Sequence, residues 1–199
     1  MFMQIAVIFL LGVFNGTGLG PTPEDTKRKP EQDKKVYQPD EILKRMGNAY
    51  ANCRTYRDTG RVTTIFITGK RRHAEVKDFE SAFVRPDQFR FEYREEQGGF
   101  VNQRYIIWRK GESVKSYWTI KPEIRVWETL SMATAAATGV SAGTAHTIPT
   151  LLMPHEISGR KLTELTDLSK LDDGVEREIP CYRIRGMEGD RPMTLWIEK

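Results

Sequence analysis

Cysteine and histidine are scarce in this chain, with two cysteines and three histidines among 199 residues. None of them has the spacing of a zinc finger or of a Cys-x-x-Cys redox motif. We therefore expect neither a metal nor a cofactor. A strong excess of one charge is also lacking, because 31 Lys and Arg residues stand against 27 Asp and Glu residues and leave a net charge of +4. Such a weak basic excess does not favour nucleic acid as a partner.

A long hydrophobic run is lacking as well. The apolar run at residues 5–14 has ten residues, which is too short to span a membrane and is typical of the core of a secretory signal. We interpret residues 1–20 as a signal peptide and residues 21–39, which are polar and contain prolines, as a linker. An N-terminal strand or helix of the core is the alternative. The signal-peptide interpretation predicts a soluble protein exported to the periplasm.

If the protein is exported, its two cysteines are candidates for a disulfide, because paired cysteines in an oxidising compartment commonly form disulfides. Cys53 and Cys181 are the candidate pair. Two free buried thiols are the alternative, and the sequence leaves both open because it does not fix the distance between the two residues.

Residues 40–199 are predicted to form one α+β domain, since 39% of the chain is hydrophobic and its length suits a single core. An apolar stripe with helical spacing at residues 39–53 predicts an opening helix. Apolar and polar residues then alternate, which predicts strands connected as an antiparallel meander. The predicted strands lie at residues 62–67, 79–83, 89–94, 105–109, 113–119 and 123–128.

The segment at residues 130–154 is rich in Ala, Thr, Gly and Ser, which predicts one or two short helices that lie over the sheet as a lid. Gly139, Gly143 and Pro149 are the expected breaks. The Asp-Asp-Gly sequence at residues 172–174 is predicted to turn the chain back into strands at residues 179–184 and 193–197. The sequence ends inside the last of these, which favours a domain truncated at its C-terminus.

Residues 139–143 match the Gly-x-Ser-x-Gly nucleophile elbow of serine hydrolases, with Ser141 as the nucleophile. The elbow requires a strand in front of the serine, whereas helix-forming residues precede it here. The carboxylate pairs at residues 95–96 and 172–173 are expected at turns and in solvent, where nothing separates their pKa values for acid–base work. The sequence therefore predicts a protein that is not an enzyme.

Aromatic residues gather on one face of the predicted sheet, where Phe89, Phe91 and Tyr93 alternate with charged residues along one strand. A lid of small residues over these large rings leaves part of the concave side unfilled, and we expect a cavity there. Each methylene group of a buried acyl chain gains about 0.8 kcal/mol. An apolar cavity beneath a lid therefore suits a lipid.

The sequence at residues 85–93, Arg-Pro-Asp-Gln-Phe-Arg-Phe-Glu-Tyr, resembles the R-P-x-x-F-x-W/F-x-Y strand of periplasmic lipoprotein carriers of the LolA type. The order of the opening helix, the aromatic strands around a Lys-Gly-Glu turn, the helical insertion and the returning strands is also similar, over about residues 39–199. The resemblance implies a curved antiparallel sheet that forms an unclosed half-barrel around a helical lid, with acyl chains held between them. It also implies that Arg85 bonds to the lid and keeps the cavity closed, and that Phe89 lines it.

These observations and the resemblance predict a non-enzymatic, monomeric periplasmic carrier or chaperone that binds the acyl chains of lipoproteins or lipids. An inner-membrane donor would supply the cargo and an outer-membrane acceptor would take it. The predicted residues are Phe83, Phe89, Phe91 and Tyr93 on the sheet, Leu151, Leu152 and Met153 on the lid, and Arg85 as the latch. The alternative is an envelope sensor or interaction domain of the same fold that docks a protein partner.

Overall fold

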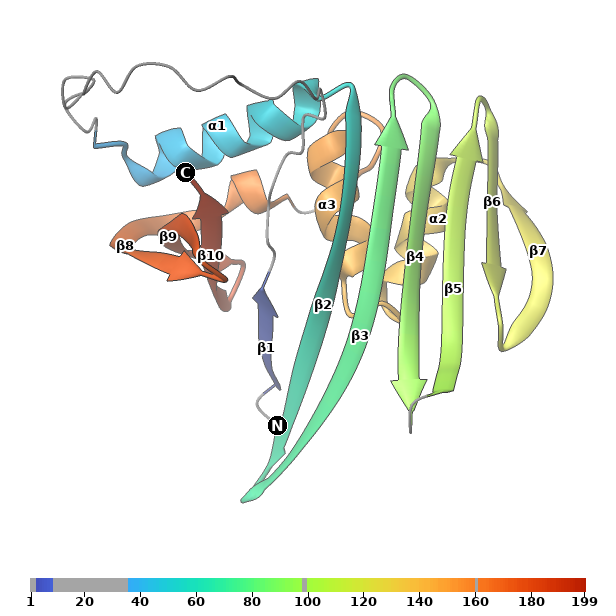
Figure 1. The fold of residues 1–199 in the computed structure, drawn as a ribbon, viewed down its shortest axis with the longest axis horizontal. Helices are drawn as coiled ribbons and strands as arrows, with labels where there is room; N and C mark the ends of the chain where they lie inside the picture. The colour runs from blue at the N-terminus through green and yellow to red at the C-terminus, as the bar shows by residue number, and fades with distance from the viewer. Residues whose placement is uncertain (1–2, 9–35, 98–99, 160) are drawn as a thin grey trace, which may run out of the picture.

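The computed structural model describes residues 3–8, 36–97, 100–159 and 161–199. These residues form an α+β structure with two antiparallel sheets (Figure 1). The larger sheet has seven strands in sequence order, from β1 to β7, and the smaller sheet has the order β10-β9-β8. Two short helices, α2 and α3, lie behind the larger sheet in Figure 1, and α1 runs along the top of the molecule toward the smaller sheet.

The larger sheet is an antiparallel meander, as the alternating pattern predicts. Its strands are β1 (Met3–Ile8), β2 (Thr55–Thr68), β3 (Arg71–Val84), β4 (Gln88–Gln97), β5 (Phe100–Lys110), β6 (Ser113–Trp118) and β7 (Lys121–Trp127). The long β2 and β3 pair along their whole length and bend visibly in Figure 1. Among the described strands β1 and β7 are the two edges, so this sheet is open and not a closed barrel.

The described part of the N-terminal segment is a strand. β1 pairs with β2 in antiparallel register, with Met3 opposite Phe66 and Ile8 opposite Arg61. The rest of the predicted signal peptide, and the predicted linker as far as residue 35, lie outside the described residues. The interpretation of residues 1–20 as a signal peptide stays a prediction.

The opening helix is confirmed as α1 (Pro39–Asn52), and its buried side chains include Ile42, Leu43, Met46 and Tyr50. The spacing of these four residues repeats every three to four positions, so one face of the helix is apolar. Through this face α1 packs against α3 and against β8 of the smaller sheet. The helix therefore joins the two sheets through one core.

Two short helices form the predicted lid, α2 (Leu130–Thr138) and α3 (Thr144–Leu152). The breaks at Gly139 and Gly143 are confirmed, and Gly143 has a φ of 87° that favours glycine. The break expected at Pro149 is wrong, because this residue lies inside α3. Its missing N–H removes one helical hydrogen bond, but the buried neighbours Ile148 and Leu151 hold the helix in the core.

The smaller sheet contains β8 (Thr166–Glu176), β9 (Ile179–Glu188) and β10 (Arg191–Glu198). The turn expected at residues 172–174 is wrong, since these residues lie within β8, and the chain turns at Arg177 and Glu178 instead. Gly174 serves close packing: a Cβ at this position would lie 2.5 Å from Cζ3 of Trp196. The carboxylates at residues 95–96 also lie inside a strand, β4, where the register with β5 shifts.

Both cysteines are free thiols in the structure, so the predicted disulfide is not formed; of the alternative, two free buried thiols, Cys181 is buried and Cys53 is partly exposed. Each thiol is turned toward the backbone of its own element. Cys53 Sγ donates to Tyr50 O at the end of α1 (3.1 Å), and Cys181 Sγ donates to Ile179 O in β9 (3.3 Å). Burial raises the pKa of both thiols, which keeps them protonated.

Within the described ranges, no helix is both long enough and apolar enough to cross a bilayer. The core lies between the larger sheet, its helices and the smaller sheet, and it contains residues from every one of these layers.

Candidate functional site

The predicted sheet-side residues share the face of the larger sheet that the helices cover, called the inner face here. The register of β3 and β4 places Phe83 opposite Phe89 and Ser81 opposite Phe91. Directly opposed residues of antiparallel strands project from the same face. Tyr93 continues the row, opposite Tyr105 on β5, and the two rings stack with centroids 6.3 Å apart. The four predicted wall residues therefore form one aromatic surface.

The predicted lid residues meet this surface. Leu151 and Leu152 end α3, Met153 is its cap, and all three belong to the same core cluster as the inner-face aromatics. The surfaces of α2 and α3 that face inward also carry fully buried alanines: Ala133, Ala137 and Ala145. Small side chains at these positions let the helices approach the large rings closely.

The expectation of a cavity between these two surfaces is wrong, because the lid is closed against the aromatic rings in this structure. Phe91, Tyr93 and Leu152 have 0% of their surface exposed, so no space large enough for water touches them. Small lid side chains were expected to leave a gap over the rings. Instead, the alanines let the lid approach until it contacts the rings. A hydrocarbon guest would enter only if the lid moved away from the sheet.

Arg85, the predicted latch, connects the sheet, the opening helix and the lid. It follows β3, and its guanidinium lies 4.9 Å from the ring centroid of Phe83. Nη2 donates to Leu152 O at the end of α3 (2.8 Å) and Nε donates to Cys53 O after α1 (2.8 Å). Ala51 O accepts a further hydrogen bond. A cation is favourable here because the last carbonyls of a helix carry partial negative charge and lack helical partners.

A second polar contact between the sheet and the lid was not predicted from the sequence. Arg109 at the end of β5 forms an ion pair with Glu156, which follows α3. Its guanidinium also donates to Pro86 O (2.9 Å) and Asp87 O (3.2 Å) in the turn between β3 and β4. Nothing in the local sequence identifies this pair, because the two charges lie far apart in the chain and meet only after folding.

A hollow of about 230 Å³ lies where β3 ends and β4 begins. Its lining comes from both faces of the sheet, because Phe83, Phe89 and Arg109 alternate there with Ala82, Val84, Gln88, Arg90 and Lys110. Phe83 and Phe89 are 2% and 3% exposed, whereas Phe91 and Tyr93 are 0% exposed.

A polar group interrupts the apolar inner face beside α1. Asp58 on β2 lies opposite Ser81 on β3, and the rings of Tyr50 and Tyr56 lie 5.3 Å apart. Buried oxygen atoms of all four side chains have no hydrogen-bond partner within normal geometry. Burial raises the pKa of Asp58 and of both tyrosines.

Burial also raises the pKa of Tyr93, a residue of the aromatic surface, to about 12.

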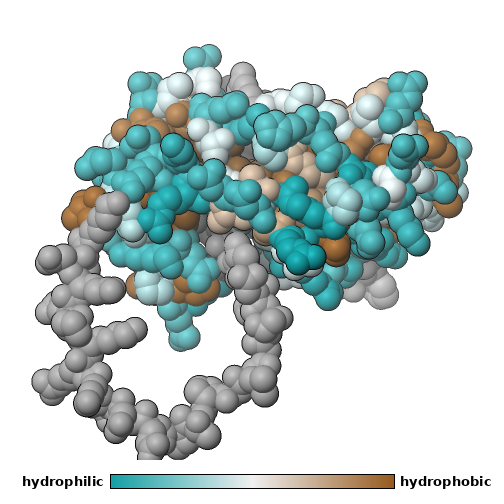
Figure 2. Space-filling view, turned by 90° about the horizontal axis from the view of Figure 1, so that it is seen from above, coloured by the Kyte–Doolittle hydropathy of each residue, from teal (hydrophilic) through white to brown (hydrophobic). Residues whose placement is uncertain are grey.

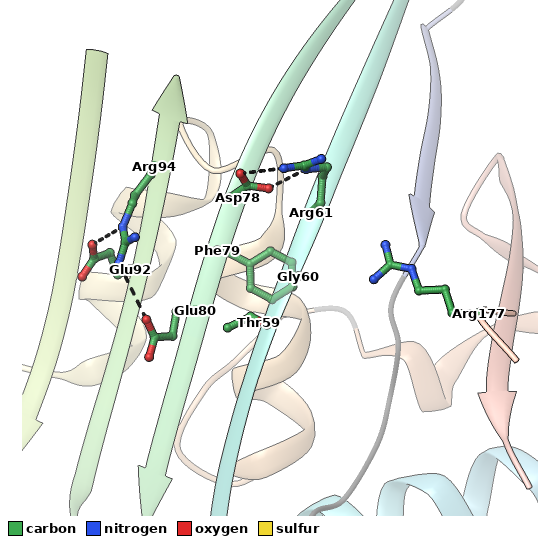
Figure 3. A pocket seen from close by; sticks show the side chains of 9 residues that line it. All are labelled: Thr59, Gly60, Arg61, Asp78, Phe79, Glu80, Glu92, Arg94 and Arg177. Atoms are coloured by element: carbon green, nitrogen blue, oxygen red, sulfur yellow. Dashed lines mark hydrogen bonds and ion pairs between the residues drawn. The ribbon is translucent and has the colours of Figure 1, made fainter. Parts of the chain in front are cut away.

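A larger hollow of about 390 Å³ lies elsewhere, beside β2, β3 and β4 (Figure 3). Its lining is mostly charged: Thr59, Gly60, Arg61, Asp78, Phe79, Glu80, Glu92, Arg94 and Arg177. Arg61 binds Asp78 (2.6 Å) and Arg94 binds Glu92 (2.7 Å), as the dashed lines in Figure 3 show. A lining of paired charges does not suit a hydrocarbon chain.

The serine motif does not form a nucleophile elbow. Ser141 lies between the two helices of the lid and is fully buried. Its Oγ accepts a hydrogen bond from Ala145 N (3.1 Å) and so supports the first turn of α3. His146 Nε2 lies 2.6 Å from Ser158 O. Within the part of the chain that the structure describes, no three His, Cys, Asp or Glu residues are grouped so that they could hold a metal ion.

Comparisons of the chain with protein-family models, with curated proteins and with solved structures give no match.

Proposed function

We propose that the protein is a carrier of acyl chains, related in design to the LolA-type lipoprotein carriers, and that the structure is its closed and empty state. Cargo would lie between the inner-face aromatics and the lid after α2 and α3 have moved outward. The proposal includes periplasmic export, a membrane donor and a membrane acceptor. No catalytic step is part of it, because lid movement and differences in affinity suffice to exchange a lipid.

The observation that carries the proposal is the set of hydrogen bonds of Arg85. One side chain holds the last carbonyl of the lid helix and the end of the opening helix against the sheet. The contacts beneath the lid are apolar and combine small side chains such as Ala133 with large ones such as Ile148 and Leu152. Opening would break the polar contacts of Arg85 and would expose these apolar side chains together with the aromatic surface, and burial of a cargo acyl chain would offset that exposure.

The test is uptake of a fluorescent fatty acid by the full chain and by Arg85→Gln. A hydrogen bond from a charged donor is worth about 1.5 kcal/mol or more, so the substitution should speed uptake about tenfold. Arg57→Gln is the matched control, because the side chain of Arg57 on β2 is 76% exposed and forms an ion pair with Glu80 on the neighbouring strand. A protein that takes up no probe in either form would contradict the carrier function.

The second candidate function is an interaction domain that docks a protein partner. The filled interior is a specific argument in favour of this function. Phe91 and Tyr93 need no guest to be buried. Mass spectrometry of the intact purified protein separates the two functions. Bound lipid of stoichiometric amount favours the carrier, whereas a lipid-free protein that also rejects the fatty-acid probe after Arg85→Gln favours the interaction domain.

A further inference from the structure

The face of the larger sheet opposite the helices, called the outer face here, carries a second group of apolar residues. Tyr117 on β6 lies opposite Ile106 on β5 and opposite Ile124 on β7, which forms one row across three strands. In the neighbouring row, Lys115 lies between Trp108 and Val126. We call these residues the outer patch: Ile106, Trp108, Tyr117, Ile124 and Val126.

The outer patch is exposed where it reaches the edge of the sheet. Ile124 and Val126 are 62% and 68% exposed, and Trp127 is the only buried residue of β7. Figure 2 shows hydrophobic groups at the surface of the end of the molecule where β6 and β7 lie. Trp108 and Tyr117 are partly exposed, whereas Ile106 is buried beneath its neighbours. A single exposed apolar side chain needs no explanation, but apolar side chains that reach solvent on three adjacent strands indicate a binding surface.

Basic residues border the outer patch on the same face. Arg90 pairs across the strands with Trp108, and Arg94 pairs with Arg104. Together with Lys115 these arginines place four positive charges on this part of the outer face, where Glu92 and Glu80 are the carboxylates that pair with them. Four positive charges against two negative charges leave +2 in this group. The guanidinium groups stay accessible, since the side chains of Arg90, Arg94 and Arg104 are each more than 40% exposed.

We propose that the outer face docks on the surface of a membrane that contains anionic lipid. Tryptophan and tyrosine prefer the level of the headgroups, and basic side chains beside them attract lipid phosphates. Ile124 and Val126 would reach the boundary of the acyl chains, as the apolar side of an interfacial element does. The two aliphatic side chains favour a membrane over single-stranded nucleic acid, whose bases would stack on aromatic rings instead.

This docking surface is separate from the proposed acyl site, because inner-face and outer-face residues alternate along each strand. A membrane on the outer face would leave α2 and α3 uncovered on the opposite side. The proposal therefore stands or falls independently of the carrier function, and its test uses no fatty-acid probe.

The test measures sedimentation of the full chain with vesicles of phosphatidylcholine alone and of phosphatidylcholine mixed with phosphatidylglycerol. We expect binding to the mixed vesicles, weakened by salt because part of it is electrostatic. The double variant Ile124→Ser and Val126→Ser should lower the affinity about tenfold, and Lys115→Glu should do the same. All three residues lie on the outer face, so the variants should fold normally, which circular dichroism checks.

The matched controls make the same types of substitution, an apolar residue to serine and a lysine to glutamate, at residues outside the outer patch. Val175→Ser replaces an apolar residue that is 65% exposed on β8, and Lys44→Glu reverses an exposed charge on α1. Both controls should bind like the unchanged protein. Quenching of tryptophan fluorescence by lipids with brominated chains should occur and should weaken in Trp108→Phe.

Two outcomes would overturn the proposal. One is an unchanged protein that does not bind the mixed vesicles; if that protein binds a single-stranded oligonucleotide instead, the outer face is assigned to nucleic acid. The other is a set of patch variants that bind the mixed vesicles as well as the controls do.

Discussion

At the scale of single residues, Glu92 shows how a buried charge is held on the outer face. Only 2% of its side chain is exposed, and it accepts hydrogen bonds from Arg94 (2.7 Å) and Arg104 (2.7 Å) and one from Arg90. Burial alone would raise the pKa of Glu92, but the hydrogen bonds and charges of Arg104 and Arg94 outweigh it and lower the pKa from 4.5. The folded state therefore prefers the ionised form.

The substitution Glu92→Gln should destabilise the protein by about 2 kcal/mol at neutral pH, because three arginines would lose their common partner. The figure lies below the cost for a fully buried pair, since the three arginine side chains are partly exposed and screened by water. A lowered folded pKa gives stability that is present above pH 4.5 and is lost as the pH falls through the folded pKa. The difference between the two proteins in urea denaturation should shrink accordingly below pH 4.5.

Glu80→Gln is the control for this prediction, because Glu80 lies on the same face with 28% of its side chain exposed. It should cost about 0.5 kcal/mol. Equal losses in both variants, or a Glu92→Gln difference that stays constant as the pH falls, would contradict the role assigned to Glu92. Asp58 works in the opposite sense, since burial raises its pKa from 3.8 and its ionisation disfavours the folded state above that value.

At the scale of elements, the pairing of β2 with β3 depends on one glycine. Gly60 lies opposite Phe79, whose ring covers it, and a Cβ at residue 60 would lie 2.2 Å from Cζ of that ring. Gly60→Ala should therefore force Phe79 out of its packing and cost about 2 kcal/mol. Thermal unfolding followed by circular dichroism measures the loss.

Gly139→Ala provides the comparison, because nothing lies within 4 Å of a Cβ at residue 139 and its φ of −63° suits alanine. That variant should be neutral or more stable by about 0.5 kcal/mol. If Gly60→Ala proved as harmless as Gly139→Ala, the tight contact with Phe79 would not limit the stability of the sheet.

The same elements show why part of the fold follows from sequence. The alternation of Phe89, Phe91 and Tyr93 with charged residues identifies β4, because a strand places successive side chains on opposite faces. Glycine is less informative without the fold. Gly143 separates the two lid helices as expected and is the N-cap of α3, whereas Gly174 lies within β8 under Trp196 and marks a close approach between strands. The residue type is the same, and only its neighbours in space separate the two roles.

At the scale of the whole molecule, the residues of the candidate site were predictable but its volume was not. Sequence patterns place Phe91 and Leu152 on facing surfaces, and both lie in one core cluster. How closely these surfaces approach depends on Ala133, Ala137 and Ala145, which the sequence argument counted as too small to fill the space. Tertiary ties such as Arg109 with Glu156 leave no local signal at all, since each charge resembles an ordinary exposed residue.

The lid should also move as a unit of its own. α2 and α3 have nine residues each, which is too short for a helix to be stable alone in water, and polar contacts of Arg85 and Arg109 tie the second of them to the sheet. Amide hydrogen exchange should therefore be at least about tenfold faster in α2 and α3 than in the middle of β4 and β5. Mass spectrometry of peptides from the full chain measures both regions in one experiment.

Arg85→Gln makes this prediction specific to the lid. The variant should speed exchange in α3 and leave β4 and β5 unchanged, because local opening exposes only the helix whose last carbonyl the arginine holds. Arg57→Gln should change neither region, since that side chain is exposed and pairs with Glu80 on the neighbouring strand. If Arg85→Gln accelerated lid and sheet equally, the arginine would support the fold as a whole, and the lid would have no separate opening for cargo to use.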